Sequence, residues 1–244
     1  MPNKTLQIPT RDGYADAFAA FPDRLEASPG ILMYPDAFGI RPVLREMAQK
    51  LADCGYFVLV PNIFYRHGPT PLIELPDYIG EENRPAIVEQ LMPLINQHTT
   101  EQAYSDARAN VEFLLRQSEV SRGPIGVIGY CLGGLLAART AAAHPGVVAA
   151  IAAFHGPVEA DGVSTLEKIK AKIHFGHAES DVDIDGLGRL NSRLDEAGLD
   201  YTSEIYPGTA HGFTMSDTDT FDLGGMQRHW DRLRSLLDSA LPEA

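Results

Sequence analysis

Apolar residues occur along the chain in two patterns, each typical of one kind of strand. The segment at 14–21 roughly alternates apolar and polar positions, as a half-buried antiparallel strand does. Unbroken apolar runs, which are typical of strands covered on both faces of a parallel sheet, are found at 31–34, 56–60, 125–129, 147–154 and 173–175. Stretches with helical spacing lie between them, at 43–51, 102–115, 135–143, 187–197 and 226–237. The alternation predicts an α/β fold, a mostly parallel twisted sheet with helices on both faces.

The segment from Arg66 to Thr100 interrupts this alternation. It is rich in proline, although 86–96 has a helical pattern. Ligands bind at the C-terminal edge of the strands in this architecture, so we interpret the segment either as an excursion over that edge or as a plain surface insertion. The length of 244 residues is compatible with a single domain, 1–244.

The composition narrows the classes of function. Hydrophobic residues make up 44% and charged residues 22%, which is ordinary for a globular protein. The net charge of -13 argues against nucleic acid and anionic membranes as partners. There is no signal-peptide pattern, and the longest apolar run is strand-sized, so a cytoplasmic protein without a membrane span is predicted. Cys54 and Cys131 are not spaced as a disulfide framework or a zinc site.

The strongest chemical signal is centred on Cys131. An apolar strand runs into Gly129-Tyr-Cys-Leu-Gly133, and a helical pattern follows. This is the nucleophile-elbow pattern with cysteine in place of serine, in which glycines let two backbone segments pass closely. The N-terminus of the following helix favours a thiolate, and the N–H of Leu132 faces the developing oxyanion. A packed structural cysteine is the alternative, and the flanking strand and helix favour a catalytic one.

A thiol nucleophile needs a base, and His211 is the best candidate. It lies in a turn between a short strand at 202–205 and the last helix, which fits the chain order of nucleophile, acid and histidine. The acid is expected in the loop after the strand at 171–175. Asp181 is our choice there, and Glu179 is the alternative.

Four carboxylates crowd this acidic loop. Asp183 and Asp185 are expected to cap the helix that begins near Gly186. Alternating acids also resemble part of a calcium loop, but the glycine and the distal glutamate of that motif are out of register. We therefore predict no metal site.

Asp36 and the residues after it follow the strand at 31–34. A loop at this place usually supplies the second oxyanion donor, so the N–H groups of Ala37 and Phe38 are candidates, with Ala37 preferred. Asp36 would then lie near the thiol. A plain turn is the alternative, because Pro-Asp-x-x-Gly is common turn chemistry.

Taken together, these motifs resemble the dienelactone hydrolase family, also called carboxymethylenebutenolidases, over nearly the whole length. The matching motifs are Gly129-Tyr-Cys-Leu-Gly-Gly134, Asp36-Ala-Phe-Gly39 and Pro207-Gly-x-x-His211-x-Phe213, with Arg45-Glu46, Gly55-Tyr56, Pro61 and Arg66 in the family's order. The resemblance implies an α/β-hydrolase fold and a Cys-His-Asp triad. It also implies that neither a metal nor an organic cofactor is used.

The resemblance further implies that an acid holds the proton of the resting thiol until substrate binding releases it toward an arginine. The corresponding acid here is Asp36, one methylene shorter than the usual glutamate. The family's arginine for the substrate carboxylate has no obvious match, and Arg66 or Arg84 could replace it. Phe38 and Tyr130 are the other predicted substrate contacts. This departure leaves other small esters, lactones and thioesters open beside dienelactone.

The sequence thus predicts hydrolysis of a small-molecule ester or lactone by Cys131, His211 and Asp181, through a thioester acyl-enzyme. A thioesterase or a promiscuous carboxylesterase on the same triad is an alternative. A non-catalytic ligand-binding protein on this scaffold is an alternative of another class. A redox-sensing Cys131 is disfavoured, because Cys54 is expected at the end of a helix and is a poor resolving partner. We expect a monomer or a homodimer.

Overall fold

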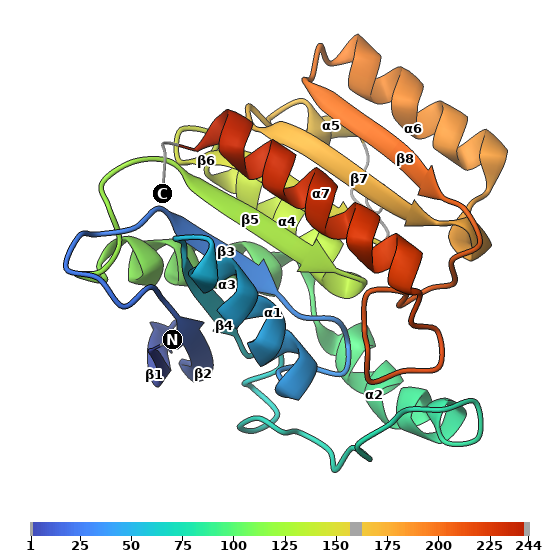
Figure 1. Ribbon diagram of the computed structural model, residues 1–244, viewed down its shortest axis with the longest axis horizontal. Coiled ribbons are helices and arrows are strands. Elements are labelled where there is room, and N and C mark those ends of the chain that lie inside the picture. Colours follow the sequence, from blue (N-terminus) through green and yellow to red (C-terminus); the bar gives the residue numbers. More distant parts are fainter. Residues whose placement is uncertain (1, 157–162, 242–244) are drawn as a thin grey trace.

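The computed structural model describes residues 2–156 and 163–241, which are built around one eight-stranded sheet (Figure 1). Its strands are β1 (Asn3–Thr10), β2 (Gly13–Ala20), β3 (Gly30–Tyr34), β4 (Phe57–Pro61), β5 (Ile125–Tyr130), β6 (Val148–Phe154), β7 (Lys172–Ala178) and β8 (Tyr201–Tyr206). Their order in the sheet is β1-β2-β4-β3-β5-β6-β7-β8. The β1–β2 and β2–β4 pairs are antiparallel, and the remaining pairs are parallel. The predicted mostly parallel sheet is confirmed.

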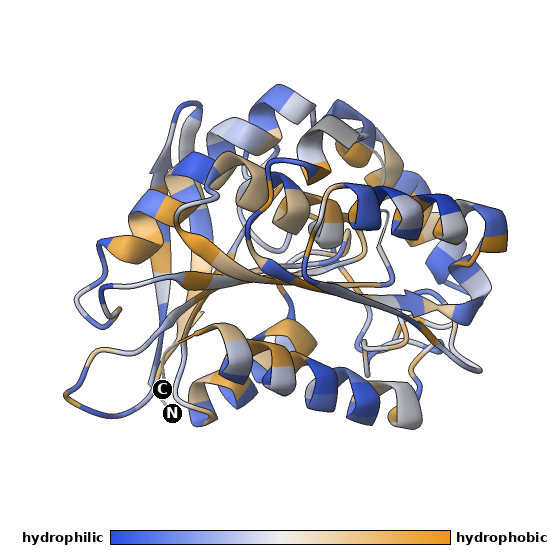
Figure 2. Cartoon of the chain, turned by 90° about the horizontal axis from the view of Figure 1, so that it is seen from above, coloured by the Kyte–Doolittle hydropathy of each residue, from blue (hydrophilic) through white to orange (hydrophobic). Residues whose placement is uncertain are grey.

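Helices cover both faces of this sheet, as Figure 2 shows in a nearly edge-on view. They are α1 (Pro42–Asp53), α2 (Arg84–Gln97), α3 (Thr100–Leu115), α4 (Leu132–Ala143), α5 (Val163–Leu166), α6 (Ile184–Glu196) and α7 (Leu223–Ala240). Helices α1 and α7 pack into one apolar cluster, and α3, α4 and α6 pack into another. Strands β3, β4 and β5 are buried at every position, as their unbroken apolar runs predict. Across the two described ranges, no helix combines the length and apolar character needed to cross a membrane.

Two elements are not predicted by the hydrophobic pattern. Strand β1 lies at the edge of the sheet, and Ile8 is its one buried residue. Backbone pairing with β2 along its whole length sets its place in the sheet. Because most of its side chains are not buried, the sequence of β1 contains no apolar run. Helix α5 has four residues, too few for a helical period to be recognised.

The segment from Arg66 to Thr100 carries α2 away from the sheet and packs it beside the loop before α7 (Figure 1). Ile79, Ile87 and Leu91 form a small apolar cluster, and Phe38 packs against it. The backbone N–H of Ile79 donates to the carbonyl of Asp217 at 2.8 Å. The segment is thus joined both to the loop after β3 and to the loop before α7.

Candidate active site

Cys131 lies in the sharp turn between β5 and α4, where it is the N-cap residue of α4. Its φ of 53° places it in a left-handed conformation that residues other than glycine rarely adopt. A Cβ at Gly129 would collide with the carbonyl of Gly133, and a Cβ at Gly133 would lie 2.6 Å from the carbonyl oxygen of Pro35. The two glycines therefore allow the turn to form and let α4 begin against the loop after β3.

This close approach brings the residues of the two candidate N–H donors to the cavity that the thiol lines. Leu132 is the first residue of α4, and Ala37 lies in the loop after β3. Both residues line one cavity together with Cys131. The N–H groups in the first turn of a helix have no partner within the helix, and the helix dipole favours negative charge there. The N–H of Leu132 is therefore suited to an oxyanion next to the sulfur, and that of Ala37 stays a candidate for the second donor.

His211 contacts both a carboxylate and the thiol. Its Nδ1 lies 2.7 Å from Asp181 Oδ2, and its backbone N–H donates to Ser180 Oγ at 3.0 Å. The hydrogen bond with Asp181 and the one with Cys131 raise the pKa of His211 to about 10, against the opposing effect of burial. Burial acts to raise the pKa of Asp181, but the hydrogen bond and the charge of His211, together with the hydrogen bond from Ser180, outweigh it and the pKa is lowered. His211 thus carries a proton at neutral pH, and Asp181 is ionised.

Two other acids of this loop have separate partners. Glu179, the alternative acid, accepts a hydrogen bond from the N–H of Gly208 at 2.8 Å and so holds the turn before His211. Asp183 caps α6 by accepting from the N–H groups of Asp185 and Gly186 at 3.2 and 3.1 Å, whereas Asp185 lies in the first turn of α6 and is not a cap as predicted. Within the described ranges, no three His, Cys, Asp or Glu side chains gather as ligands for a metal ion.

Asp36 does not occupy the role that the resemblance implies. Its two carboxylate oxygens accept from the Arg41 guanidinium at 2.6 and 2.9 Å, and Oδ1 also accepts from the N–H of Phe38. Arg41 in turn donates to Asp217 Oδ2 at 2.6 Å. In this structure Asp36 is the ion-pair partner of Arg41, while the thiol is hydrogen-bonded to His211. Asp36 is therefore not the holder of the thiol proton here.

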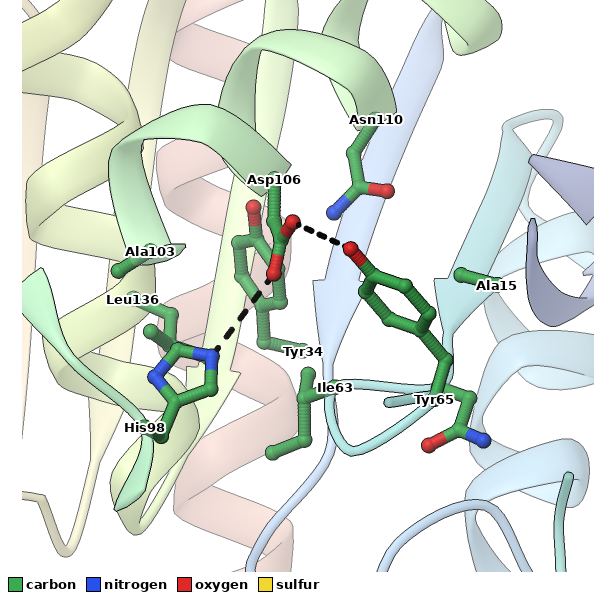
Figure 3. Close-up of a pocket in the computed structure, with 10 residues that line it drawn as sticks. Ala15, Tyr34, Ile63, Tyr65, His98, Ala103, Asp106, Asn110 and Leu136 are labelled. Carbon is green, nitrogen blue, oxygen red and sulfur yellow. Dashed lines mark hydrogen bonds and ion pairs between the residues drawn. The ribbon is translucent and has the colours of Figure 1, made fainter. Parts of the chain in front are cut away.

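Two of the predicted substrate contacts lie elsewhere. Tyr130 is fully buried, and its hydroxyl lies 3.0 Å from His229 Nε2 on the α7 side of the sheet. Arg66 donates to Asp12 and to Asp106. Asp106 in turn lines a separate cavity of only about 10 Å³ (Figure 3). Neither residue lines the cavities at Cys131. The prediction that Tyr130 and Arg66 contact the substrate is therefore wrong, and both side chains make contacts within the protein.

The other two predicted contacts, Phe38 and Arg84, line a cavity of about 510 Å³ at Cys131. Helix α2 forms one wall of it, so the segment from Arg66 to Thr100 borders the site. A second cavity, of about 440 Å³, extends past Gly156 and His177. Cys131 lies where the two cavities meet.

His155, the residue after β6, is a neighbour of His211 that also lines both cavities at Cys131. It is fully buried, has a φ of 40°, and its Nε2 lies 2.8 Å from Thr214 Oγ1. Burial lowers the pKa of His155 to about 3, and the charge of His211 adds to this. The two imidazole rings pack edge to face with centroids 5.2 Å apart. The neutral imidazole of His155 thus packs against the protonated ring of His211 without adding a second positive charge.

Three residues of the site are not identified by sequence analysis: Arg41, Ser180 and Asp217. Arg41 and Asp217 are 176 positions apart, so no local pattern connects them. Ser180 lies between Glu179 and Asp181, and a single serine among carboxylates has no pattern of its own. The five-residue separation of Asp36 and Arg41 is the one available signal, because a turn can close such a pair.

A family model and several known proteins that are similar to this chain identify its family. The model of the dienelactone hydrolase family matches residues 15–241. A Methylorubrum extorquens protein provisionally named carboxymethylenebutenolidase is 25% identical over 239 residues, which are 94% of this chain and 78% of that protein. The carboxymethylenebutenolidase of Pseudomonas putida is 30% identical over 138 residues, 56% of this chain and 55% of that protein. A Klebsiella pneumoniae structure, provisionally described as dienelactone hydrolase, covers 96% of this chain and 97% of its own, with a TM-score of 0.81 and 17% identity, a likeness of fold alone.

Proposed function

Because the chain belongs to the dienelactone hydrolase family and is an ester hydrolase, we propose that it cleaves a small ester or lactone through an acyl group carried by Cys131. One observation carries this proposal: the contacts that run from Asp181 through His211 to the thiol. The strained turn at Cys131 and the N-terminus of α4 support it, because together they expose a nucleophile beside oxyanion donors.

In the first half of the proposed reaction, the Cys131 thiolate attacks the carbonyl carbon and the carbonyl electron pair moves to oxygen. The N–H groups of Leu132 and Ala37 donate to this oxyanion, and loss of either donor should cost about 10²–10³-fold in rate. When the intermediate collapses, the bond to the leaving oxygen breaks. His211 gives its proton to that oxygen, and a thioester remains on Cys131.

In the second half, neutral His211 takes a proton from water, and the resulting hydroxide attacks the thioester carbonyl. The same two N–H groups hold the second oxyanion. Collapse releases the carboxylic acid and restores the Cys131 thiolate beside protonated His211. Asp181 holds the ring of His211 in the tautomer with a proton on Nδ1 and stabilises the imidazolium, while the carboxylate itself stays ionised.

The test is hydrolysis of p-nitrophenyl acetate by wild type, Cys131→Ala and Cys54→Ala. Cys54 is an exposed free thiol and serves as the matched control. We expect Cys131→Ala to lose about 10⁴-fold or more in kcat, because the nucleophile is absent. Cys54→Ala should keep wild-type turnover and remain sensitive to iodoacetamide.

Turnover that survives in Cys131→Ala would contradict the proposed nucleophile. A wild-type protein that hydrolyses no ester, and whose Cys131 is alkylated no faster than Cys54, would instead favour the non-catalytic ligand-binding protein. Mass spectrometry of the wild type after rapid acid quenching should detect one acetyl group on Cys131, and none in Cys131→Ala.

A further inference from the structure

The larger cavity at Cys131 is lined mainly by apolar side chains. Its apolar wall is formed by Phe38, Val88, Leu91, Met92, Ile95 and Met215. Val88 and Met92 are 37% and 41% exposed, so α2 presents large apolar side chains to open space at this place. Exposed apolar side chains that converge on a cavity are typical of a surface that binds an apolar ligand.

The fixed charges in this lining are already paired within the protein. Arg84 forms an ion pair with Asp219. Asp36 is bound by Arg41, which also binds Asp217. Of the described residues that line the cavity, Arg84 is the one lysine or arginine. A substrate carboxylate would therefore have to displace Asp219 or enter without a cationic partner, and either is costly in an apolar site.

His155 and His211, the two histidines that line both cavities at Cys131, offer no unpaired positive charge to a substrate carboxylate. Protonated His211 is matched by Asp181 at 2.7 Å, and burial keeps His155 neutral by lowering its pKa to about 3. The net charge of -13 adds a field that is unfavourable for an anionic ligand. The electrostatics of the site therefore select against a negatively charged substrate.

The apolar wall is also held in place. The N–H of Asp219 donates to the carbonyl of Ile79 at 3.1 Å, and Ile79 donates back to the carbonyl of Asp217. Together with the Arg84–Asp219 ion pair, these bonds fasten the segment that carries α2 to the loop before α7. A preformed apolar cavity binds an apolar group without first paying for its own ordering.

We infer that the substrate is an uncharged ester or lactone whose apolar group fills the cavity between α2 and the loop before α7, rather than one that carries a carboxylate. This inference rests on the proposed function, because it names the substrate class of the same site. A cavity of about 510 Å³ is within the size range of small-molecule sites.

The first test compares kcat/KM for p-nitrophenyl butyrate and p-nitrophenyl hydrogen succinate, whose acyl chains have equal length and differ in a terminal carboxylate. The proteins are wild type, Met92→Lys and Gln90→Lys. Both variants add one positive charge to α2, but Met92 lines the cavity and Gln90 is exposed outside it. We expect wild type to prefer butyrate by about tenfold or more, and Met92→Lys to reduce this preference by about tenfold. Gln90→Lys should keep the wild-type preference.

Equal rates on the two esters, or a preference of wild type for the succinate ester, would overturn the inference. An equal shift in Met92→Lys and Gln90→Lys would also overturn it, because the overall charge and not the cavity would then decide the preference. A reduced preference in Met92→Lys alone supports it.

Binding to Cys131→Ala separates the substrate class from the chemistry. An NMR titration with methyl pentyl ketone, and with the same chain ending in a carboxylate in place of the terminal methyl group, measures selection by the cavity without any covalent step. Tighter binding of the uncharged ketone supports the inference even if wild type hydrolyses neither ester, in which case the proposed function alone fails. Equal or tighter binding of the carboxylate overturns the inference, whatever the esters show.

Discussion

His211 with Asp181, and His98 with Asp106, are two histidine–aspartate pairs in very different surroundings. The nearest atoms are 2.7 Å apart in the first pair and 3.9 Å apart in the second. The side chain of His211 is 47% exposed and contacts the Cys131 thiol, whereas that of His98 is 5% exposed and lies at the small polar cavity of Figure 3. The same two residue types are thus placed once beside the proposed nucleophile and once in the interior.

The partners of the carboxylate explain the difference in charge. Asp106 divides its oxygens between Tyr65 and Arg66, so little of its charge is left for His98, and burial lowers the pKa of His98. Asp181 instead directs Oδ2 at His211, and the pKa of His211 rises to about 10. Asp181 also accepts from Ser180 Oγ, but that partner is neutral, whereas the partner of Asp106 is an arginine. A histidine can work as an acid and a base where its carboxylate is not paired with an arginine and a cavity admits substrate.

The largest expected effect is on the rate. Asp181→Asn should lower kcat by about 10³–10⁴-fold, because an amide no longer fixes the tautomer of His211 or stabilises the imidazolium. Glu179→Gln is the matched control and should cost far less, since Glu179 holds only the N–H of Gly208. Steady-state hydrolysis of p-nitrophenyl butyrate measures both. A loss in Glu179→Gln as large as that in Asp181→Asn would move the role of the acid to Glu179.

Local sequence patterns predict this site well where the chemistry lies in short segments. Gly129-Tyr-Cys-Leu-Gly133 contains all of the constraints that form the elbow, so Cys131 and Leu132 can be located without a structure. The parallel strands are predicted for the same reason, because burial on both faces leaves an unbroken apolar run. The edge strand β1 leaves no such run, since its backbone pairing makes few demands on side chains.

Contacts across long separations could not be predicted in this way. Tyr130 and Cys131 are adjacent in sequence, but Tyr130 ends β5 with its ring on the α7 side, so adjacency does not make it a substrate contact. Arg66 and Arg84 both lie in the proline-rich segment, and only the fold assigns one to the Asp106 cluster and the other to the cavity wall. Likewise, Arg41 donates both to Asp36 and to Asp217, and Asp217 lies far along the chain.

The next largest expected effect is on stability and concerns the pair of His98 and Asp106. Asp106→Asn removes one of the two carboxylates that pair with the largely buried Arg66 and leaves Asp12 as the other, so it should lower the free energy of unfolding by about 1–3 kcal/mol. Since Asp106 lies outside both cavities at Cys131, kcat/KM of the folded variant should stay close to that of wild type.

Glu101→Gln is the matched control, because it breaks the exposed Arg11–Glu101 ion pair and should cost at most about 1 kcal/mol. Urea unfolding followed by circular dichroism measures both variants. If Asp106→Asn is as stable as Glu101→Gln, the polar cluster is not a stabilising element. If Asp106→Asn lowers kcat as strongly as Asp181→Asn does, the two histidine–aspartate pairs do not differ in the way described.

The smallest effects are pH dependences of opposite sign. Folding raises the pKa of His211 from about 6.5 to about 10, so its contribution to stability is fully present below about pH 6.5 and is lost as the pH rises through about 10. Folding lowers the pKa of His98, so the unfolded chain binds that proton more readily and stability falls as the pH drops below about 6.5. The contribution of His211 should be under about 1 kcal/mol, because solvent screens its half-exposed pair with Asp181.

Urea unfolding of wild type, Asp181→Asn and His98→Gln between about pH 5 and pH 10 measures the two slopes as differences between proteins. Asp181→Asn should weaken the alkaline dependence, because the hydrogen bond with Cys131 remains, and should keep the acid one. His98→Gln should lose the acid dependence and keep the alkaline one. The buried histidines His174 and His229, whose pKa values burial also lowers, cancel in each difference, and His155, which faces Asp181, cancels in that of His98→Gln. Asp106, Arg66 and Arg139 face His98, and Cys131, Asp181 and His155 face His211, so each variant leaves the other group's surroundings intact. Differences of the same sign for both variants would mean that the two histidines titrate alike. The contrast between a carboxylate that is paired with an arginine and one that is not would then not hold.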